Sequence, residues 1–188
     1  ADGAFQLTAR EVSPAFAVRF NPDSRLMMSL HPESAILWDT ASTAEIQRFP
    51  LGLPASTNLR ERVQVAFDAS SDDVTFFVQI DNNLAGLTRF NLYEEDVIRQ
   101  TYIDVSRGDI TADGAYLLLA LTDNSVQLID IPSGEVLRRF VGHSDQINAM
   151  IYQPQNEMLF TASNDNTLIR WDVETGAIAH QYRHTTDV

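Results

Sequence analysis

Four side chains in the C-terminal part of the sequence have types that could do chemistry together: His143, Thr161, Asp165 and Trp171. An imidazole placed between a carboxylate and a hydroxyl can use both of its ring nitrogens, which is the logic of a catalytic triad. If the same groups were buried, they would instead satisfy one another, because buried polar groups are almost always hydrogen-bonded. The residue types alone therefore allow catalysis, a metal site or a structural network.

Signatures of other chemistry are absent from the sequence. It has no cysteine, no phosphate-binding loop, no dinucleotide-binding glycine pattern and no G-x-S-x-G nucleophile motif, and its four histidines lack the spacing of a zinc motif. Asp and Asn gather at 81–83, 123–125 and 164–166, where their oxygens could bind Ca²⁺. None of these stretches is a complete calcium loop, and tight turns also select Asp and Asn. The sequence therefore predicts neither a metal nor a cofactor.

The composition of the chain limits the kinds of partner that it can bind and bears on its source and location. The chain has 188 residues, 44% of them hydrophobic, which suits one domain or part of a larger one. The net charge is −13 and all 13 basic residues are arginine. Binding to a phosphate backbone relies on clustered Lys and Arg, so the sequence does not predict a nucleic-acid partner. No apolar run approaches the ~20 residues of a membrane span. The absence of lysine hints at a GC-rich coding sequence, and a bacterial source is expected. A cytoplasmic location is slightly favoured over export, although the start, ADGAFQL, would also suit a mature exported protein or a fragment.

The chain repeats itself. Residues 108–143 align with residues 150–184 over most of their length at a shift of 42, which places Asp123 on Asp165 and Phe140 on Tyr182. The first half repeats more loosely, with Trp38-Asp39 and Phe90-Asn91 at the position of Trp171-Asp172. Four units therefore cover residues 11–183. Repeats of this length indicate an array of small structural units.

Each unit has the pattern of four short strands. The last one reads INAMIY, EMLFTA, TLIRWDV and AIAHQY, separated by turn-forming residues. No segment has a helical period with capping residues. A single four-stranded meander cannot bury both of its faces, whereas units stacked around an axis can. The sequence predicts an all-β fold.

The last unit resembles the WD-repeat β-propeller family. The resemblance rests on Gly142-His143, a strand ending at Tyr152, the stretch 161–167 and Trp171-Asp172, and it extends more weakly over nearly the whole chain. It implies a β-propeller segment of about four blades of four-stranded antiparallel sheet, an incomplete part of a larger propeller. The implied boundaries are 1–10 for an outer strand of a neighbouring blade, 11–50, 57–101, 102–141 and 142–183 for blades 1 to 4, and 184–188 for the start of a further repeat.

The resemblance also implies a role for the four side chains. In the family the corresponding residues form a buried hydrogen-bonded network, so His143, Thr161, Asp165 and Trp171 are expected to lock one blade rather than to catalyse. The other units carry Glu11, Asn58 and Thr101 at the histidine position, and Leu119 at the position of Thr161. The network is therefore expected to be complete only in the last unit.

As to function, the resemblance implies a non-catalytic scaffold for protein–protein interaction or complex assembly. The expected partner-binding face consists of loops, and its candidates are Glu33, Asp81, Asn82, Ser106, Arg107, Asp123, Asn124, Ser144, Asp145, Gln146 and Asn164. Its acidity predicts a protein partner with a basic surface. Self-association, including two copies in an eight-bladed ring, or completion by further blades is a further expectation. The alternative function is an exported propeller enzyme or ligand-binding sensor with its site at the central channel.

Overall fold

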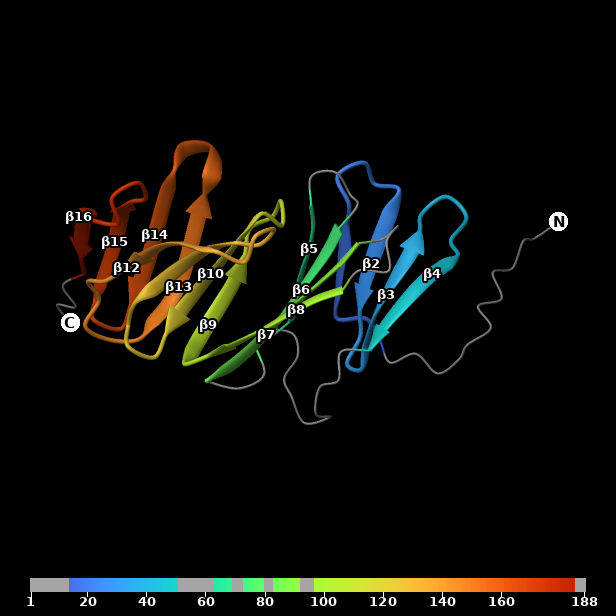
Figure 1. Ribbon diagram of the computed structural model, residues 1–188, viewed down its shortest axis with the longest axis horizontal. Helices are drawn as coiled ribbons and strands as arrows, with labels where there is room; N and C mark the ends of the chain where they lie inside the picture. The colour runs from blue at the N-terminus through green and yellow to red at the C-terminus, as the bar shows by residue number, and fades with distance from the viewer. Residues whose placement is uncertain (1–13, 51–62, 69–72, 80–82, 92–96, 185–188) are drawn as a thin grey trace. The chain divides into compact units, whose positions relative to one another are not determined.

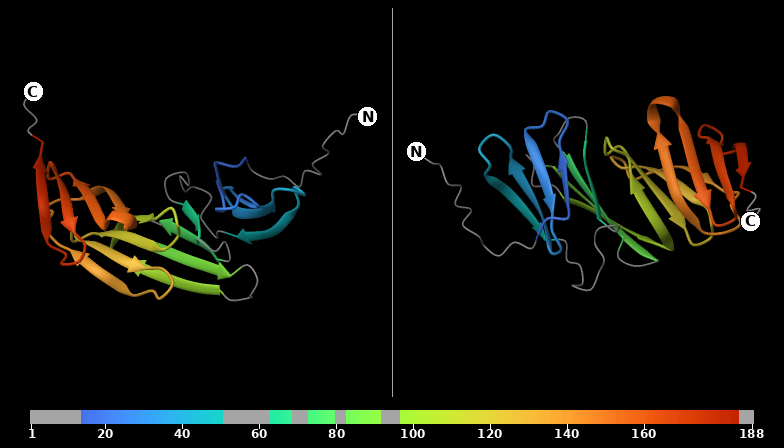
Figure 2. Two further views of the ribbon diagram at one scale, coloured as in Figure 1. Left: turned by 90° about the horizontal axis from the view of Figure 1, so that it is seen from above. Right: turned by 180° about the vertical axis from the view of Figure 1, so that it is seen from behind.

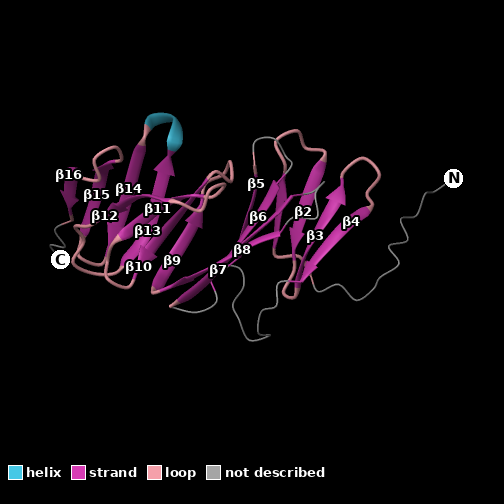
Figure 3. Cartoon of the chain, in the orientation of Figure 1, coloured by secondary structure: helices cyan, strands magenta, loops and turns pink. Residues whose placement is uncertain are grey.

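The computed structural model describes residues 14–50, 63–68, 73–79, 83–91 and 97–184. In these ranges the chain is all-β, with four four-stranded antiparallel sheets and one short 3₁₀ helix (Figures 1 and 3). The chain divides into two compact units, residues 1–60 and residues 61–188. The predicted fold class, all-β with about four blades, is confirmed.

The first unit contains one sheet. Its strands follow each other in the order β1 (Ala17–Phe20), β2 (Leu26–Leu30), β3 (Ser34–Asp39) and β4 (Glu45–Pro50). Side chains alternate between the two faces of a strand, so neighbouring residues of β2 lie on opposite faces. Met28 and Leu30 are buried on one face, while Met27 and Ser29 lie on the other. We call this the first sheet.

The second unit contains three sheets, which we number in chain order. The second sheet consists of β5 (Val63–Phe67), β6 (Asp73–Gln79), β7 (Leu84–Asn91) and β8 (Val97–Ile103); the third of β9 (Val105–Ile110), β10 (Tyr116–Leu121), β11 (Val126–Asp130) and β12 (Val136–Phe140); the fourth of β13 (Ile147–Gln153), β14 (Met158–Ser163), β15 (Thr167–Asp172) and β16 (Ile178–Arg183). The 3₁₀ helix, η2 (Pro154–Asn156), joins β13 to β14. Each sheet is an antiparallel meander, and Figure 2 shows the three sheets of this unit side by side.

The third sheet is the centre of the hydrophobic core of the second unit, because it buries both of its faces. On β10, Leu117 and Leu119 join a cluster with Phe77 and Leu87 of the second sheet. The intervening residues point the other way and join a cluster with the fourth sheet; these are Leu118 and Ala120, packed with Met150, Leu159, Ile169 and Trp171. A run of consecutive apolar residues, YLLLAL, is what a strand buried on both faces requires.

One glycine is needed for this stacking. Gly108 of β9 lies directly against the ring of Phe77 on β6, and a Cβ atom at this position would overlap the ring. Phe77 is fully buried, so its ring has little room to move away. The second and third sheets therefore approach closely only because residue 108 has no side chain.

The aspartate of each Trp-Asp position closes the turn between the third and fourth strands of its sheet. Asp39 accepts hydrogen bonds from Ser42, Asp130 from Ser133, and Asp172 from Thr175. The residue four positions after each aspartate has a positive φ of 59°, 73° and 77° at Thr43, Gly134 and Gly176, respectively. This backbone region favours glycine, which explains the Gly of the last two units. The aspartate of the dipeptide is thus a turn residue.

The strand limits differ from some of the expected boundaries. Strand β8 continues to Ile103, two residues beyond the expected end of blade 2 at 101. Asp104, with φ 59°, is the single residue between β8 and β9. Ser106 and Arg107 therefore lie inside β9 and not in a loop that enters it, which corrects their expected position. The segments 1–10 and 185–188 lie outside the described residues.

Candidate functional site

The fourth sheet brings His143, Thr161, Asp165 and Trp171 together. Thr161 lies in β14, Trp171 in the neighbouring strand β15, Asp165 in the turn between them, and His143 in the link from β12 to β13. Leu159 pairs with Trp171 across β14 and β15. Thr161 lies two residues beyond Leu159, so Thr161 and Trp171 share one face of the sheet.

The four side chains form a continuous hydrogen-bonded chain. Trp171 Nε1 donates to Thr161 Oγ1 at 2.8 Å, Thr161 Oγ1 lies 2.7 Å from His143 Nε2, and His143 Nδ1 lies 2.8 Å from Asp165 Oδ2. An indole nitrogen can only donate and a carboxylate can only accept, so Trp171 Nε1 donates to Thr161 Oγ1 and His143 Nδ1 donates to Asp165. In the neutral imidazole Nε2 is then an acceptor, and Thr161 Oγ1 donates its proton to it. This tautomer satisfies every group in the chain.

Asp165 is the acceptor at the end of this chain. Besides His143, its carboxylate receives the backbone N–H of Ser144 at 3.0 Å, and the backbone N–H and hydroxyl of Thr167 at 2.9 and 2.6 Å. Burial favours the neutral form of Asp165, but the hydrogen bonds from Thr167, Ser144 and His143 outweigh it and hold the pKa of this carboxyl well below its ordinary range. The anionic carboxylate thus fixes both the histidine and the turn.

Burial decides what this arrangement can do chemically. The sequence of contacts from hydroxyl to imidazole to carboxylate is that of a triad. Thr161, however, is only 1% exposed, and its oxygen already accepts the Trp171 N–H. The imidazole side chain of His143 is 0% exposed. No substrate carbonyl can reach this hydroxyl, so the geometry suits a cross-link between strands and not acyl transfer.

The glycine before the histidine has a local reason. A Cβ atom at Gly142 would lie 3.0 Å from Cη2 of the Trp171 ring and 2.9 Å from the end of Ile178. The Trp171 ring is held in place by its bond to Thr161 and by Phe140, whose ring centroid is 5.5 Å away. A glycine lets the backbone pass close to this ring on its way to His143. The Gly-His pair is therefore one packing feature.

Next to the network, the chain exposes a polar edge. Ser144, Asp145, Gln146 and Asn164 are all exposed, and we call these four residues the 144–164 edge. Hydrogen bonds fix it: Asn164 N–H donates to the Gln146 carbonyl at 2.9 Å, and Ser163 Oγ donates to the Asp145 carbonyl at 2.8 Å. Because Ser144 N–H also binds Asp165, the buried network and the exposed edge are one connected structure.

The other candidates of the predicted face have different positions. Asp123 and Asn124 lie in the turn between β10 and β11, the equivalent of Asp165 and Asn166, and Glu33 lies exposed in the turn between β2 and β3. Asp81 and Asn82 lie outside the described residues. Asp123 accepts hydrogen bonds from Ser125 and from Arg139, so this turn is closed without a histidine.

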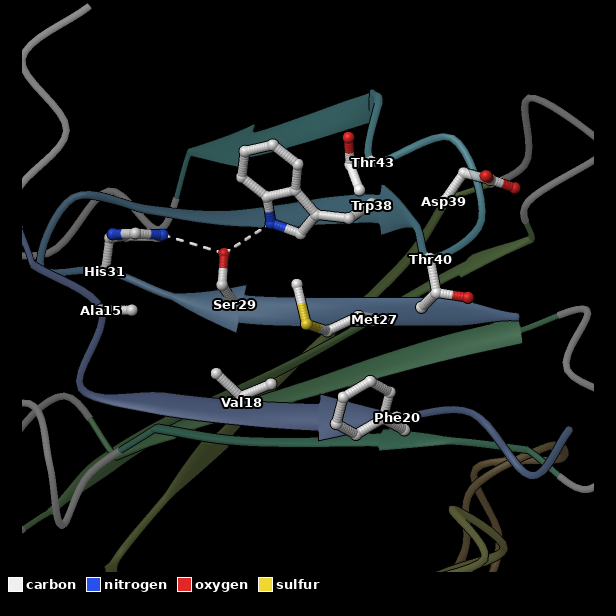
Figure 4. Close-up of a pocket in the computed structure, with 10 residues that line it drawn as sticks. All are labelled: Ala15, Val18, Phe20, Met27, Ser29, His31, Trp38, Asp39, Thr40 and Thr43. Carbon is white, nitrogen blue, oxygen red and sulfur yellow. Dashed lines mark hydrogen bonds between the residues drawn. The ribbon is translucent and has the colours of Figure 1, made fainter. Parts of the chain in front are cut away.

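A second indole–hydroxyl–imidazole chain, in the first sheet, was missed by the sequence analysis. Trp38 Nε1 donates to Ser29 Oγ at 2.7 Å, and Ser29 Oγ lies 2.9 Å from His31 Nε2 (Figure 4). Here the histidine comes from the turn after β2 and not from the link before the first strand. The spacing of nine residues between Ser29 and Trp38, against ten between Thr161 and Trp171, was the available signal.

The two Asp/Asn stretches that the structure describes in full, 123–125 and 164–166, use aspartate oxygens to bind the chain itself. Asn124 and Asn166 have positive φ angles of 66° and 62°, and the aspartate before each one accepts from the residue two positions later. Within the described ranges, no group of three or more His, Asp or Glu side chains is placed to hold a metal ion.

In the same ranges, no helix has the length and apolarity to cross a membrane.

The depressed pKa of Asp165 predicts sensitivity to acid. Between the folded pKa and the unfolded pKa of Asp165, the unfolded chain binds more protons than the folded one. The stabilisation by Asp165 is therefore complete above the pKa of an unfolded aspartate, about 4. It is lost as the pH falls through the folded pKa. Urea unfolding between pH 6 and 3 should show a shallower loss of stability for Asp165→Asn than for the wild type. Parallel profiles for the two proteins would contradict this prediction.

The comparisons with known proteins agree with this architecture. The family model for the WD domain, G-beta repeat, matches residues 134–172. WD repeat-containing protein 36 of Homo sapiens is 36% identical over 66 residues, 35% of this chain and 7% of that protein. Apoptotic protease-activating factor 1 of Danio rerio is 24% identical over 164 residues, 85% of this chain and 12% of that protein. Target of rapamycin complex subunit LST8 of Saccharomyces cerevisiae is 31% identical over 93 residues, 48% of this chain and 30% of that protein.

The short matches limit which properties of these relatives can be assigned to this chain. The matched regions span under a third of each relative, 7%, 12% and 30% of their lengths. All three relatives are eukaryotic, so the expected bacterial source finds no support. Residues 134–172 thus match the WD40 repeat model, and the four four-stranded sheets agree with a WD-repeat propeller of about four blades.

Proposed function

We propose that the chain is a non-catalytic scaffold segment that binds a protein partner through the 144–164 edge, and that the buried network holds this edge in its binding conformation. The observation that carries the proposal is the connection through Asp165. One carboxylate binds the buried His143 and the backbone of the exposed Ser144. A rigid, exposed polar edge loses little conformational entropy on binding, which favours recognition.

The neighbouring sheet extends this edge. In Figure 1, β9 and β13 run in the same direction, so the turns that hold Asp123 and Asn164 lie on the same side of their sheets. The net charge of the chain is −13, and the exposed Asp145 adds negative charge at this side, whereas Asp123 is paired with Arg139. A partner with a basic surface would be steered towards it, and salt would slow the association.

The relatives support the class of function and not the identity of the partner. One is named as a subunit of the target of rapamycin complex, so a protein similar to this chain belongs to a complex. The triad-like hydroxyl of Thr161 is inaccessible, so the four residues of the buried network do not support the enzymatic alternative, whose site was expected at the central channel. A non-catalytic role is therefore preferred.

The test is a charge reversal at the edge with a matched control. Asp145→Arg changes the edge, whereas Glu157→Arg makes the same charge change in the same sheet, after η2 at the opposite end of β14. The immobilised chain and both variants are incubated with extract of the source cells, and the retained proteins are quantified by mass spectrometry. We expect Asp145→Arg to lose a specific set of proteins that wild type and Glu157→Arg retain, and we expect 0.5 M salt to weaken their capture.

Circular dichroism melting shows whether the variants remain folded. If folded Asp145→Arg retained the same proteins as wild type, the proposed edge would be wrong. The proposal would also fail if both variants lost the same proteins to the same extent, because binding would then follow total charge and not this edge.

A further inference from the structure

The open face of the first sheet has the same register as a buried face of the fourth sheet. Trp38 pairs with Met27 across the first sheet, as Trp171 pairs with Leu159 across the fourth. The outer strands continue the match. Phe20 pairs with Met27 and Val18 with Ser29, as Tyr152 pairs with Leu159 and Met150 with Thr161. We call Val18, Phe20, Met27, Ser29 and Trp38 the Trp38 face.

In the fourth sheet this face is covered. Met150 is 2%, Leu159 0% and Trp171 2% exposed, because the third sheet packs on them. The covering residues are Leu118, Ala120, Val126, Leu128 and Phe140, and the Phe140 ring lies against Trp171. The third sheet therefore shows which kind of surface packs against a face of this type.

In the first sheet the equivalent face is open. Val18 is 41% and Phe20 57% exposed. They border a hollow of about 620 Å³, which is also lined by Met27, Trp38 and, at its end, the Ser29–His31 pair (Figure 4). Exposed apolar side chains grouped around a hollow commonly mark an interaction site.

The outer face of the fourth sheet repeats the covering surface. At the shift of 42 residues, the residues that cover Trp171 recur as Phe160, Ala162, Leu168, Arg170 and Tyr182. Tyr182 is 45% exposed, and Ile151, which pairs with Phe160, is 60% exposed. We call Ile151, Phe160, Ala162, Leu168 and Tyr182 the Tyr182 face. The strand pairing is the same in both sheets, since Leu168 pairs with Tyr182 as Val126 pairs with Phe140.

We infer that two copies of this chain associate head to tail, with the Tyr182 face of one copy covering the Trp38 face of another. Tyr182 would take the place against Trp38 that Phe140 has against Trp171. Arg170 takes the place of Leu128 among the covering residues and adds a positive charge to the surface of one copy. Asp39 lines the hollow at the Trp38 face of the other copy and offers the opposite charge. The contact joins two different surfaces, so it is heterologous and each copy keeps one free face unless the assembly closes. It does not depend on the 144–164 edge.

The test is complementation between two variants in sedimentation velocity. Phe20→Asp places a charge in the Trp38 face and Tyr182→Asp places one in the Tyr182 face. Ile103→Asp is the matched control, because Ile103 is 69% exposed and lies in neither face. Wild type and the control should associate as the concentration rises. Each of the two face variants alone should require at least about tenfold higher concentration to associate.

Mixing the two face variants is the decisive measurement. Each retains the intact surface that the other lacks, so the mixture should form a one-to-one heterodimer that does not grow further. A monomeric wild type at about 100 μM, well above the Kd of a micromolar complex, would overturn the inference. It would also fail if folded Tyr182→Asp still associated like wild type, because two Trp38 faces would then be pairing with each other. A mixture that stays monomeric would likewise exclude the head-to-tail contact.

Discussion

Replacing Asp165 with alanine is expected to lower the free energy of unfolding of the second unit by about 3 kcal/mol. The substitution removes the acceptor of the His143 imidazole and of three donors from Ser144 and Thr167. The imidazole lies wholly inside the protein, so water cannot replace the lost acceptor there. Apart from a longer contact with Thr167 Oγ1 at 3.3 Å, this buried donor loses its acceptor, which is the largest part of the expected loss.

The measurement uses the two tryptophans, one in each unit. In a Trp38→Phe background, urea unfolding followed by fluorescence reports on Trp171 and hence on the fourth sheet. The matched control is Asp123→Ala, which removes the equivalent turn aspartate of the third sheet, where the side chain is 53% exposed and no histidine is bound. We expect a loss of about 1 kcal/mol for the control. Equal losses at the two positions would show that the turn, and not the buried histidine, carries the energy.

The repeat of 42 residues made much of the fold predictable. It places apolar residues of β10 and β14 in the same register, and strand alternation then determines which face each one occupies. The four-stranded sheets follow from that register. The approach of His143, Thr161, Asp165 and Trp171 was instead implied by the resemblance of the last unit to the WD-repeat family. A period and an alternation are properties of the chain itself, so a single sequence is sufficient to detect them.

What the sequence did not reveal depends on backbone geometry between repeats. The histidine of the first sheet comes from the turn after β2, and His31 therefore stands outside the position where the repeat pattern expects it. Ser106 and Arg107 were misplaced for a related reason. A single residue with positive φ, Asp104, joins β8 to β9, so β9 begins earlier than a loop of ordinary length would allow. Neither feature changes the composition or the period of the sequence.

Thr161→Val is expected to cost the second unit about 2–3 kcal/mol although it changes almost no volume. Valine keeps the branched shape that suits a strand, so packing and strand propensity are retained. Only the oxygen is lost, and with it the acceptor of the Trp171 N–H and the donor to His143 Nε2. Both partners remain buried beneath the third sheet, where neither can reach water. Urea unfolding in the Trp38→Phe background measures the loss.

The first sheet provides the comparison that separates burial from bonding. Ser29→Ala removes the equivalent hydroxyl, but its tryptophan lies on the open Trp38 face, where Trp38 borders the hollow. Ser29 and His31 are buried, at 6% and 7% exposed, so water can replace the lost partner only at the half-buried Trp38. We therefore expect a smaller loss than for Thr161→Val, measured through Trp38 in a Trp171→Phe background. Equal losses would mean that the bond geometry alone sets the energy. A smaller loss at Ser29 would mean that the shared hydroxyl contributes its full stabilisation only where another sheet covers it. The protein concentration must be kept low for this comparison, because a second copy on the Trp38 face would raise the cost of Ser29→Ala towards that of Thr161→Val.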